Sequence, residues 1–260
     1  MSNNPESFAN AAVSLVIPVY HAHDNINRLV VEAITFFSNA GLAYEIILVD
    51  DCSTDGTWSA LKSLYAQFPE TVKCYHLKSN LGQYGATITG ISKSSGNYII
   101  TIDDDFNPHP GQIGKLISIK DDCELAYGNS KSTEKNLLRR GGSWAIHLGI
   151  MITTGRFKLS MGSSFRLFNR SLWNRMQPKL NTPEALDIEL LRNARGKIIF
   201  IETESNSSPA KSSHSSIQLI KLALKILLSG LSKDRLQMQK LLAGELIDGE
   251  LNVSRNHEKN

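Results

Sequence analysis

Segments that favour β-strands alternate with segments that favour helices through the N-terminal part of the chain, and this alternation constrains the fold most strongly. Short apolar runs predict strands at residues 13–19, 45–49, 72–77 and 97–100. Apolar residues at helical spacing predict helices at residues 26–37, 58–68 and from 80 onward. Asp24 is the expected cap of the first helix and Gly41 its stop. The expected fold class is therefore α/β, with right-handed crossovers and a mainly parallel sheet.

Polar side chains follow each of the four expected strands. Tyr20 follows the first strand, Asp50 and Asp51 end the second, Asn80 follows the third, and three aspartates follow the fourth. The carboxyl ends of parallel strands share one edge of a sheet, and ligands lie beyond that edge. Four polar strand ends in a row therefore predict a binding site.

The three consecutive carboxylates of Asp103, Asp104 and Asp105 predict a nearby cation, because like charges at the end of a buried strand repel one another. A hard divalent ion held by Asp103 and Asp105, and bridging to phosphate oxygens, is the natural candidate. A solvated acidic turn is the simpler alternative. An EF-hand loop is rejected, since Pro108 stands where that motif needs glycine and Gly114 where it needs an acid.

The sequence does not support a dinucleotide-binding motif, a P-loop or a nucleic-acid partner. No Gly-x-Gly-x-x-Gly follows the first strand, which disfavours a dinucleotide fold. Gly85 and Gly90 have P-loop spacing, but Ile91 and Ser92 replace the residues that grip phosphates. A net charge of +3 is too small to indicate a nucleic-acid partner.

Cysteine usage and hydropathy indicate a cytoplasmic location. Cys52, Cys74 and Cys123 are scattered singly, as in a reducing compartment. The first ten residues lack an apolar signal core. No apolar run approaches the ~20 residues that span a bilayer. Peripheral contact with the inner membrane stays open.

Four segments, in order, resemble the signature of family 2 glycosyltransferases with the GT-A fold. They are Ser14–Tyr20, Val49–Thr57, Asn80–Gln83 and Asp103–Pro108, and Gly162–Phe168 and Ala210–Ser213 extend the likeness. Within the family, the chain looks most like the polyprenyl-phosphate glycosyltransferases, the branch of dolichyl-phosphate mannose synthase. The resemblance covers residues 12–232 and implies a doubly wound GT-A sheet with a C-terminal helical extension.

The resemblance also implies site residues. Pro18 and Tyr20 would border the base, and Asp51 would bind the uracil or ribose side of the nucleotide. The other residues expected at the nucleotide are Asp50, Asn80, Gln83 and Asp104.

A metal site is implied as well. Asp103 and Asp105 would hold Mg²⁺ or Mn²⁺ against the diphosphate, with Asn107 as a further ligand. Arg166 and Lys211 are the expected phosphate-side cations, although Arg166 could instead be a surface charge at a strand edge.

The implied activity is that of an inverting, hexosyltransferase-type enzyme. It would move a sugar from a nucleoside-diphosphate sugar to polyprenyl phosphate or a lipid-linked glycan in bacterial envelope polysaccharide synthesis. Ser163 and Ser164 offer no general base, and Glu184 and Asp187 are the nearby acids. An acceptor phosphate is already ionised and needs no base, so a phosphate acceptor is favoured. The lack of the family's C-terminal membrane helices argues the other way. The sugar, the base and the oligomeric state are not indicated.

Departures from the family pattern leave two alternatives open. His21 and Ala22 stand in place of Asn-Glu, residues 128–131 replace Gly-x-Arg, and residues 207–209 replace an Arg-bearing segment. One alternative is a degenerate domain that binds sugar nucleotide or partners without turnover. The other is a nucleotidyltransferase, although the first loop lacks the glycine and basic residues it would need.

Four regions are expected along the chain. They are a flexible N-terminus at 1–11, the GT-A domain at 12–204, a Ser-rich flap with amphipathic helices at 205–243, and a disordered tail at 244–260. Inside the domain, a helix is expected at residues 136–154 and a last strand at 197–201. The expected helix at 217–231, with Lys221 and Lys225 on its polar stripe, could lie in a membrane interface or pack on protein.

Overall fold

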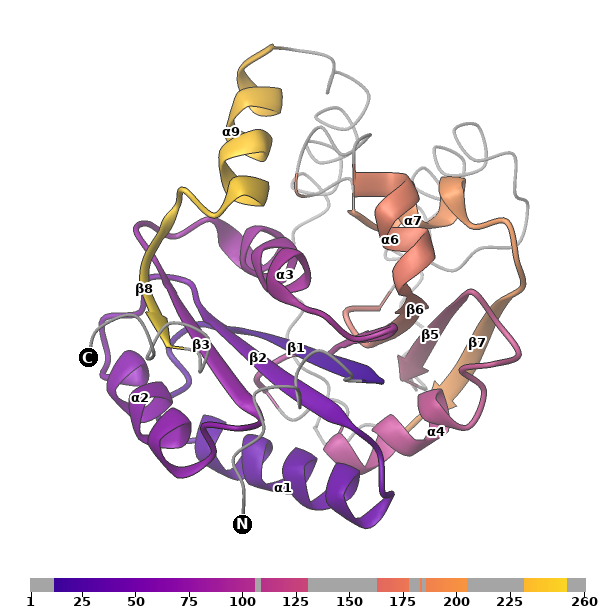
Figure 1. Ribbon diagram of the computed structural model, residues 1–260, viewed down its shortest axis with the longest axis horizontal. Coiled ribbons are helices and arrows are strands. Elements are labelled where there is room, and N and C mark those ends of the chain that lie inside the picture. Colours follow the sequence, from indigo (N-terminus) through magenta and orange to yellow (C-terminus); the bar gives the residue numbers. More distant parts are fainter. Residues whose placement is uncertain are drawn as a thin grey trace, which may run out of the picture.

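The computed structural model describes residues 12–105, 109–130, 163–177, 183, 186–204 and 232–251. Within these residues eight strands form one sheet. The strands are β1 Val13–Val19, β2 Tyr44–Asp50, β3 Val72–Leu77, β4 Tyr98–Thr101, β5 Leu125–Ser130, β6 Arg166–Asn169, β7 Ile198–Thr203 and β8 Ile247–Leu251. Their order across the sheet is β7-β5-β6-β4-β1-β2-β3-β8, and Figure 1 shows the sheet at the centre of the molecule.

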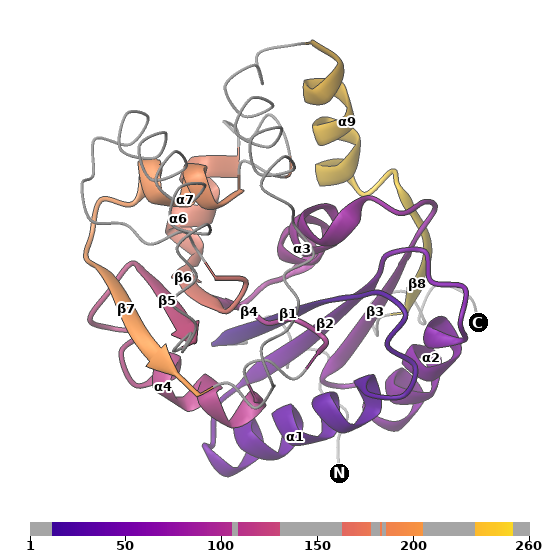
Figure 2. The same cartoon turned by 180° about the vertical axis from the view of Figure 1, so that it is seen from behind.

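Helices cover both faces of this sheet (Figures 1 and 2). They are α1 Ile26–Asn39, α2 Thr57–Gln67, α3 Gly82–Lys93, α4 Ile113–Ile117, α6 Arg170–Met176, α7 Leu186–Asn193 and α9 Ser232–Ala243, with a 3₁₀ turn, η2 Pro110–Gln112, before α4. One face carries α1, α2 and α4, and the other carries α3, α6 and α7. Helix α9 packs on α3.

The central strands are parallel and buried on both faces. β1 pairs in parallel with β2 and β4, and β2 pairs in parallel with β3. All seven residues of β1 are buried, which explains why this strand is apolar at every position but Ser14 rather than alternating. β6 lies antiparallel to β4 and β5, and β5 and β7 are parallel. The predicted α/β fold with a mainly parallel sheet is confirmed.

Most N-terminal boundaries agree with the sequence prediction, but the cap of α1 does not. The strands at 13–19 and 72–77 have the predicted bounds. Asn25, not Asp24, is the N-cap of α1, and its side chain makes no capping hydrogen bond. Gly41 follows the helix with φ +63°, a conformation that glycine adopts without strain.

The predicted disordered tail from residue 244 is wrong for residues 244–251. Residues 247–251 form β8, which pairs antiparallel with β3, so the strand at Ile198–Thr203 is not the last one. Without β8 the backbone groups of β3 would form an open sheet edge. The α9–β8 segment is anchored by Met238 and Leu241, which are buried in the core against α3.

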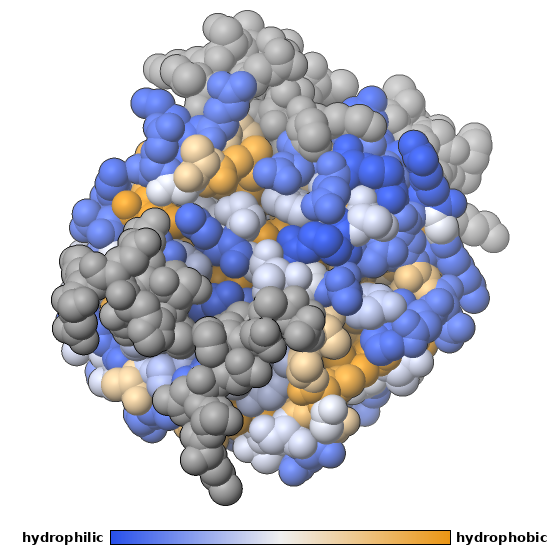
Figure 3. Space-filling model, viewed as in Figure 1, coloured by the Kyte–Doolittle hydropathy of each residue, from blue (hydrophilic) through white to orange (hydrophobic). Residues whose placement is uncertain are grey.

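The surface in Figure 3 is largely hydrophilic where the structure is described, with apolar residues visible along α9 and its connection to β8. Leu242, Leu246 and Ile247 are the partly buried residues of this region that pack against the core. No helix in the described part of the chain is long and apolar enough to cross a membrane.

Several predicted features lie outside the described residues. They are the helix at 136–154, the flap at 205–216, the helix at 217–231, and the side chains of Asn107, Glu184 and Lys211.

Candidate active site

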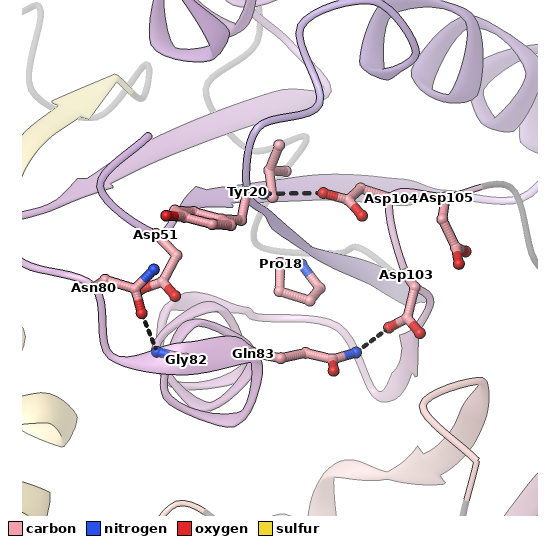
Figure 4. Close-up of a pocket in the computed structure, with 10 residues that line it drawn as sticks. Pro18, Tyr20, Asp51, Asn80, Gly82, Gln83, Asp103, Asp104 and Asp105 are labelled. Atoms are coloured by element: carbon pink, nitrogen blue, oxygen red, sulfur yellow. Dashed lines mark hydrogen bonds between the residues drawn. The ribbon is translucent and has the colours of Figure 1, made fainter. Parts of the chain in front are cut away.

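A cavity of about 430 Å³ lies at the carboxyl edge of the parallel strands (Figure 4). It is lined by Pro18, Val19, Tyr20, Asp51, Asn80, Gly82, Gln83, Asp103, Asp104 and Asp105. These residues come from the ends of β1, β2 and β4 and the loops that follow them, from the β3–α3 connection and from the first turn of α3. Because β1 pairs in parallel with both β2 and β4, the three strand ends meet at this edge. The cavity thus lies at the strand ends, where the sequence predicts a binding site.

The acidic loop after β4 forms hydrogen bonds to α3, to Ser164 and to the end of β1. Asp103 accepts hydrogen bonds from Gln83 Nε2 to Oδ1 and from Ser164 Oγ to Oδ2, each at 2.5 Å. Asp104 Oδ2 accepts a hydrogen bond from the Tyr20 backbone N–H at 2.9 Å. In Figure 4, Asp104 points toward Tyr20, whereas Asp105 does not. Asp104 is therefore bound to the β1 end of the cavity, whereas the side chains of Asp103 and Asp105 point in other directions.

The electrostatics of the loop are unfavourable without a cation. Burial raises the pKa of Asp103, and the charge of Asp105 raises it further, against the hydrogen bond from Ser164. Burial also raises the pKa of Asp104 to about 6, with contributions from both neighbouring carboxylates. A positive charge at this position would relieve the repulsion.

The donor set of the loop fits a hard divalent ion that also binds a ligand. Within the described part of the chain, no group of three or more His, Cys, Asp and Glu side chains is placed to hold a metal ion. Carboxylates suit Mg²⁺ and Mn²⁺, and Mg²⁺ sites commonly use one or two of them together with phosphate and water oxygens. Asp103 and Asp105 fit such an ion, with the remaining positions filled by a ligand.

Asp51 lines the cavity and is a buried residue, 3% exposed. Its Oδ1 accepts a hydrogen bond from the Leu81 backbone N–H at 2.7 Å. Burial raises the pKa of Asp51, although backbone hydrogen bonds from Leu81 and Gly82 oppose that effect. Tyr20 is 48% exposed at the rim, with its ring stacked on His21 at 4.0 Å between centroids. The site thus combines a buried acceptor with an exposed aromatic ring.

Asp50 is not in the cavity, which contradicts its predicted contact with the nucleotide. Its Oδ2 lies 2.7 Å from His76 Nδ1, and its Oδ1 accepts a hydrogen bond from the Ser53 backbone N–H at 3.1 Å. Asp50 and His76 are register partners on neighbouring strands. Consecutive strand residues face opposite sides of a sheet, so Asp50 and Asp51 point to different environments.

The alternative of Arg166 as a surface charge is wrong, because the residue is 2% exposed. Its guanidinium forms an ion pair with Asp187 through Nη1. Its Nε donates a hydrogen bond to Thr101 Oγ1 at 3.0 Å. Burial lowers the pKa of Arg166, but Asp187, Tyr127, Tyr84 and Asp103 together outweigh it, so the pKa is raised and the group stays charged.

Two tyrosines and a serine near this pair were missed by the sequence reasoning as functional residues. Tyr84 and Tyr127 donate hydrogen bonds to Asp187 at 3.2 and 3.1 Å, and Ser164 contacts Asp103. Tyrosines in a helix and a strand of this kind carry no sequence signal beyond packing. Ser164 stood in the Gly162–Phe168 motif, which was the signal that could have found it.

Comparison with known proteins identifies the family. The sequence profile described as "Glycosyl transferase family 2" matches residues 14–176, which is more than half of the chain. The protein therefore belongs to glycosyltransferase family 2.

Curated relatives narrow the likeness. Proteins named "Undecaprenyl-phosphate 4-deoxy-4-formamido-L-arabinose transferase" from Salmonella paratyphi B and Salmonella typhimurium are 30% identical over 165 residues. The match covers 63% of this chain and 50% of each relative. The matched part of the chain thus spans about half the length of these relatives.

Solved structures share the fold. Mannosyl-3-phosphoglycerate synthase from Rubrobacter xylanophilus matches with a TM-score of 0.55 and 14% identity, over 91% of this chain and 76% of that protein. Glucosyl-3-phosphoglycerate synthase from Mycobacterium tuberculosis, solved with Mn²⁺, UDP-glucose and phosphoglyceric acid, matches with a TM-score of 0.55 and 15% identity, over 88% and 81%. The fold is therefore of the GT-A type.

Proposed function

We propose that this chain is an inverting glycosyltransferase that moves a sugar from a nucleoside-diphosphate sugar to polyprenyl phosphate or a lipid-linked glycan. The observation that carries the proposal is an acidic loop beside a cavity of about 430 Å³, a size that suits a small-molecule ligand. Family membership and the names of the Salmonella relatives support the same reaction class. The process that this reaction would serve is envelope polysaccharide synthesis.

The nucleotide would bind along the strand ends. The exposed Tyr20 ring offers a surface to the base, with Pro18 beside it in the cavity lining. The buried Asp51 carboxylate has capacity for a hydrogen bond from a ribose hydroxyl or a base N–H. Asn80 and Gln83 extend the polar lining toward the acidic loop.

The proposed cofactor is Mg²⁺ or Mn²⁺, held by Asp103 and Asp105 with Asn107 as a further ligand. Each Asp103 oxygen accepts one hydrogen bond and so keeps a lone pair for a metal. When bound, the ion would neutralise charge on the leaving nucleoside diphosphate. Arg166 and Lys211 are the proposed phosphate-side cations, and Arg166 would act mainly through its charge because its Nε and Nη1 bind Thr101 and Asp187.

The described residues favour a phosphate acceptor over a hydroxyl acceptor. A hydroxyl requires a carboxylate base. Asp187 is a poor candidate because it is paired with Arg166 and accepts two tyrosine hydrogen bonds. An acceptor phosphate has its second pKa near ~6 by analogy with phosphoserine, so it attacks as an anion without a protein base.

Peripheral attachment to the inner membrane is the location we propose for such a reaction. The helix predicted from the sequence at residues 217–231 would present an apolar face and Lys221 and Lys225 to anionic lipid. Vesicle flotation that weakens with salt and with Lys221→Glu/Lys225→Glu is the expected outcome, and failure of the wild type to float contradicts the attachment.

The donor is tested by thermal unfolding with UDP, GDP, CDP and ADP, each with and without Mn²⁺. A ligand at 100 times its dissociation constant adds ~2.7 kcal/mol to stability, so one nucleotide is expected to raise the unfolding temperature in a Mn²⁺-dependent way. Asp105→Ala is the control and is expected to lose the Mn²⁺ dependence. A flat response to all four nucleotides contradicts the donor proposal.

The acceptor is tested by supplying the matching sugar nucleotide with undecaprenyl phosphate or with a lipid-linked glycan. Transfer to undecaprenyl phosphate, unchanged in Glu184→Gln, is expected. Transfer to the glycan alone, with a thousandfold loss in Glu184→Gln or Asp187→Asn, would establish a carboxylate base and overturn the phosphate acceptor.

A further inference from the structure

We infer that Asp187 is a positioning residue for the metal-binding carboxylate of Asp103, although the two side chains do not touch. The inference rests on the proposed function, because it assigns a role to Asp187 in the metal-dependent binding of the nucleotide. It follows from hydrogen bonds that start at Asp187 on α7 and lead to Asp103 by two routes, one through Ser164 and one through the adjacent residues Tyr84 and Gln83.

Asp187 is the point where four elements of the fold meet. Its Oδ1 receives Arg166 Nη1 from β6 and the Tyr127 hydroxyl from β5 at 3.1 Å. Its Oδ2 receives the Tyr84 hydroxyl from α3 at 3.2 Å. One carboxylate of α7 thus fixes two strands of the sheet and the helix that lines the cavity.

The first route runs through β6 and β4. Arg166 Nε donates to Thr101 Oγ1 at 3.0 Å, and the Thr101 hydroxyl donates in turn to the backbone carbonyl of Ser164. Ser164 Oγ then donates to Asp103 Oδ2 at 2.5 Å. The position of Ser164, and with it one oxygen of Asp103, therefore depends on the orientation of Arg166 that Asp187 sets.

The second route runs through the first turns of α3. Tyr84 bonds to Asp187, and its neighbour Gln83 donates to Asp103 Oδ1 at 2.5 Å. Fixing the Tyr84 hydroxyl fixes the rotation of this part of α3 and hence the reach of Gln83. Both oxygens of Asp103 are therefore held by groups that lead back to Asp187.

The energetics favour orientation over stability as the reason for this buried pair. A buried ion pair gains little net stability over apolar residues of the same volume. It does fix geometry, because the planar guanidinium and the two hydroxyls each require a defined direction to the carboxylate. A metal ligand needs that precision, since its oxygens must be held in place before the ion arrives.

The experiment measures the Mn²⁺ increment, defined as the ratio of the UDP dissociation constants without and with Mn²⁺, by calorimetry. If GDP rather than UDP raises the unfolding temperature in the thermal unfolding experiment, GDP is used here in its place. The variants are Asp187→Asn, Tyr84→Phe and Ser164→Ala. The matched control is Glu189→Gln, a buried carboxylate of the same helix that contacts Arg192 and Asn193 and neither route. Circular dichroism reports whether each variant is folded.

Asp187→Asn and Ser164→Ala are each expected to reduce the Mn²⁺ increment by about tenfold, the equivalent of one hydrogen bond to a charged group. Tyr84→Phe is expected to reduce it by a smaller factor, and Glu189→Gln to leave it unchanged. Metal-free UDP affinity is expected to stay constant in all of them, which a general loss of structure would not allow.

Two results overturn the inference. One is a folded Asp187→Asn or Tyr84→Phe with a wild-type Mn²⁺ increment, which reduces Asp187 to a packing residue. The other is an unfolded Asp187→Asn together with a wild-type increment in Ser164→Ala and Tyr84→Phe. Failure of the wild-type protein to show any increment is different, because it contradicts the proposed function itself.

Discussion

Glu45 and the three aspartates of the acidic loop lie at opposite edges of the same sheet, and the pKa of Glu45 is shifted in the opposite direction to those of Asp103 and Asp104. At the amino edge, Glu45 is fully buried and accepts hydrogen bonds from Lys73 Nζ and Ser14 Oγ, both at 2.6 Å. The backbone N–H groups of Ser95 and Gly96 add to this set. Burial raises the pKa of Glu45, but the charge of Lys73 and these hydrogen bonds outweigh it, so the pKa lies below its usual value.

At the carboxyl edge, Asp103, Asp104 and Asp105 follow β4 as three consecutive carboxylates. The pKa values of Asp103 and Asp104 are raised, with burial as the main cause and neighbouring carboxylates as a further one. The comparison shows that this fold can neutralise a buried acid completely where the acid serves structure. In the acidic loop the neighbouring carboxylates instead add to the burial that raises the pKa values of Asp103 and Asp104, and a bound cation would relieve that repulsion.

The largest effect is expected from Asp105→Ala. Because the substitution removes a proposed metal ligand, turnover should fall by at least about a thousandfold, the equivalent of several kcal/mol of charge stabilisation. The unfolding free energy should change by less than about 0.5 kcal/mol, since the residue is exposed and one repulsion is lost. Initial rates with Mn²⁺ and urea unfolding of the metal-free protein measure the two effects. Near-normal turnover would show that Asp105 does not bind the metal.

The opposite pattern is expected from Glu45→Gln. Lys73 would remain buried without its counter-charge, which typically costs about 3–5 kcal/mol. Urea unfolding measures the loss, and calorimetry with UDP and Mn²⁺ is expected to give an unchanged dissociation constant. Asp24→Asn, at a carboxylate whose side chain is 95% exposed, is the control and should change stability little. A Glu45→Gln variant that binds nucleotide poorly would contradict the assignment of Glu45 to stability and of the acidic loop to binding.

The central sheet could be predicted from sequence because its strands are buried on both faces. Val13–Val19 is apolar apart from Ser14, and Val72–Leu77 keeps buried strand-forming residues around Lys73 and His76. Such runs can be recognised without knowledge of the neighbouring strands. Ile247–Leu251 could not be predicted, because its sequence contains two acids and a glycine. That strand forms through pairing with the edge of β3, a tertiary contact that local propensity does not report.

The location of the candidate site at the strand ends could be predicted from the sequence, but the orientation of individual side chains could not. Asp103 to Asp105 and Asp51 lie where the sequence placed them. The choice between Asp50 and Asp51 depends on which side of the strand faces the cavity, and adjacent acids give no signal for it. The burial of Arg166 depends on Asp187, which comes from a helix 21 residues away in sequence.

A smaller effect is expected from Asp51→Asn, which keeps the shape and the acceptor for Leu81 N–H but removes the charge. The donor dissociation constant should rise about tenfold, with kcat changed little, because a contact to the base or ribose is similar in the ground and transition states. Steady-state kinetics with varied sugar nucleotide separates the two parameters. A fall in kcat at unchanged KM would assign Asp51 to the chemical step instead.

The last prediction concerns the acid dependence of stability, where only part of the Glu45→Gln effect is expected to change with pH. The folded-state pKa of Glu45 lies below its usual value of 4.5, so the group binds protons more weakly in the folded than in the unfolded protein. Its contribution to stability is therefore complete above the unfolded-state pKa and is lost as the pH falls through the folded-state pKa. Free energies of unfolding from urea titrations of wild type and Glu45→Gln, plotted from pH 7 to the acid limit, should run parallel at neutral pH and approach each other in acid. Curves that stay parallel throughout would mean that Glu45 does not titrate differently on folding, and its environment would then offer no contrast with the acidic loop.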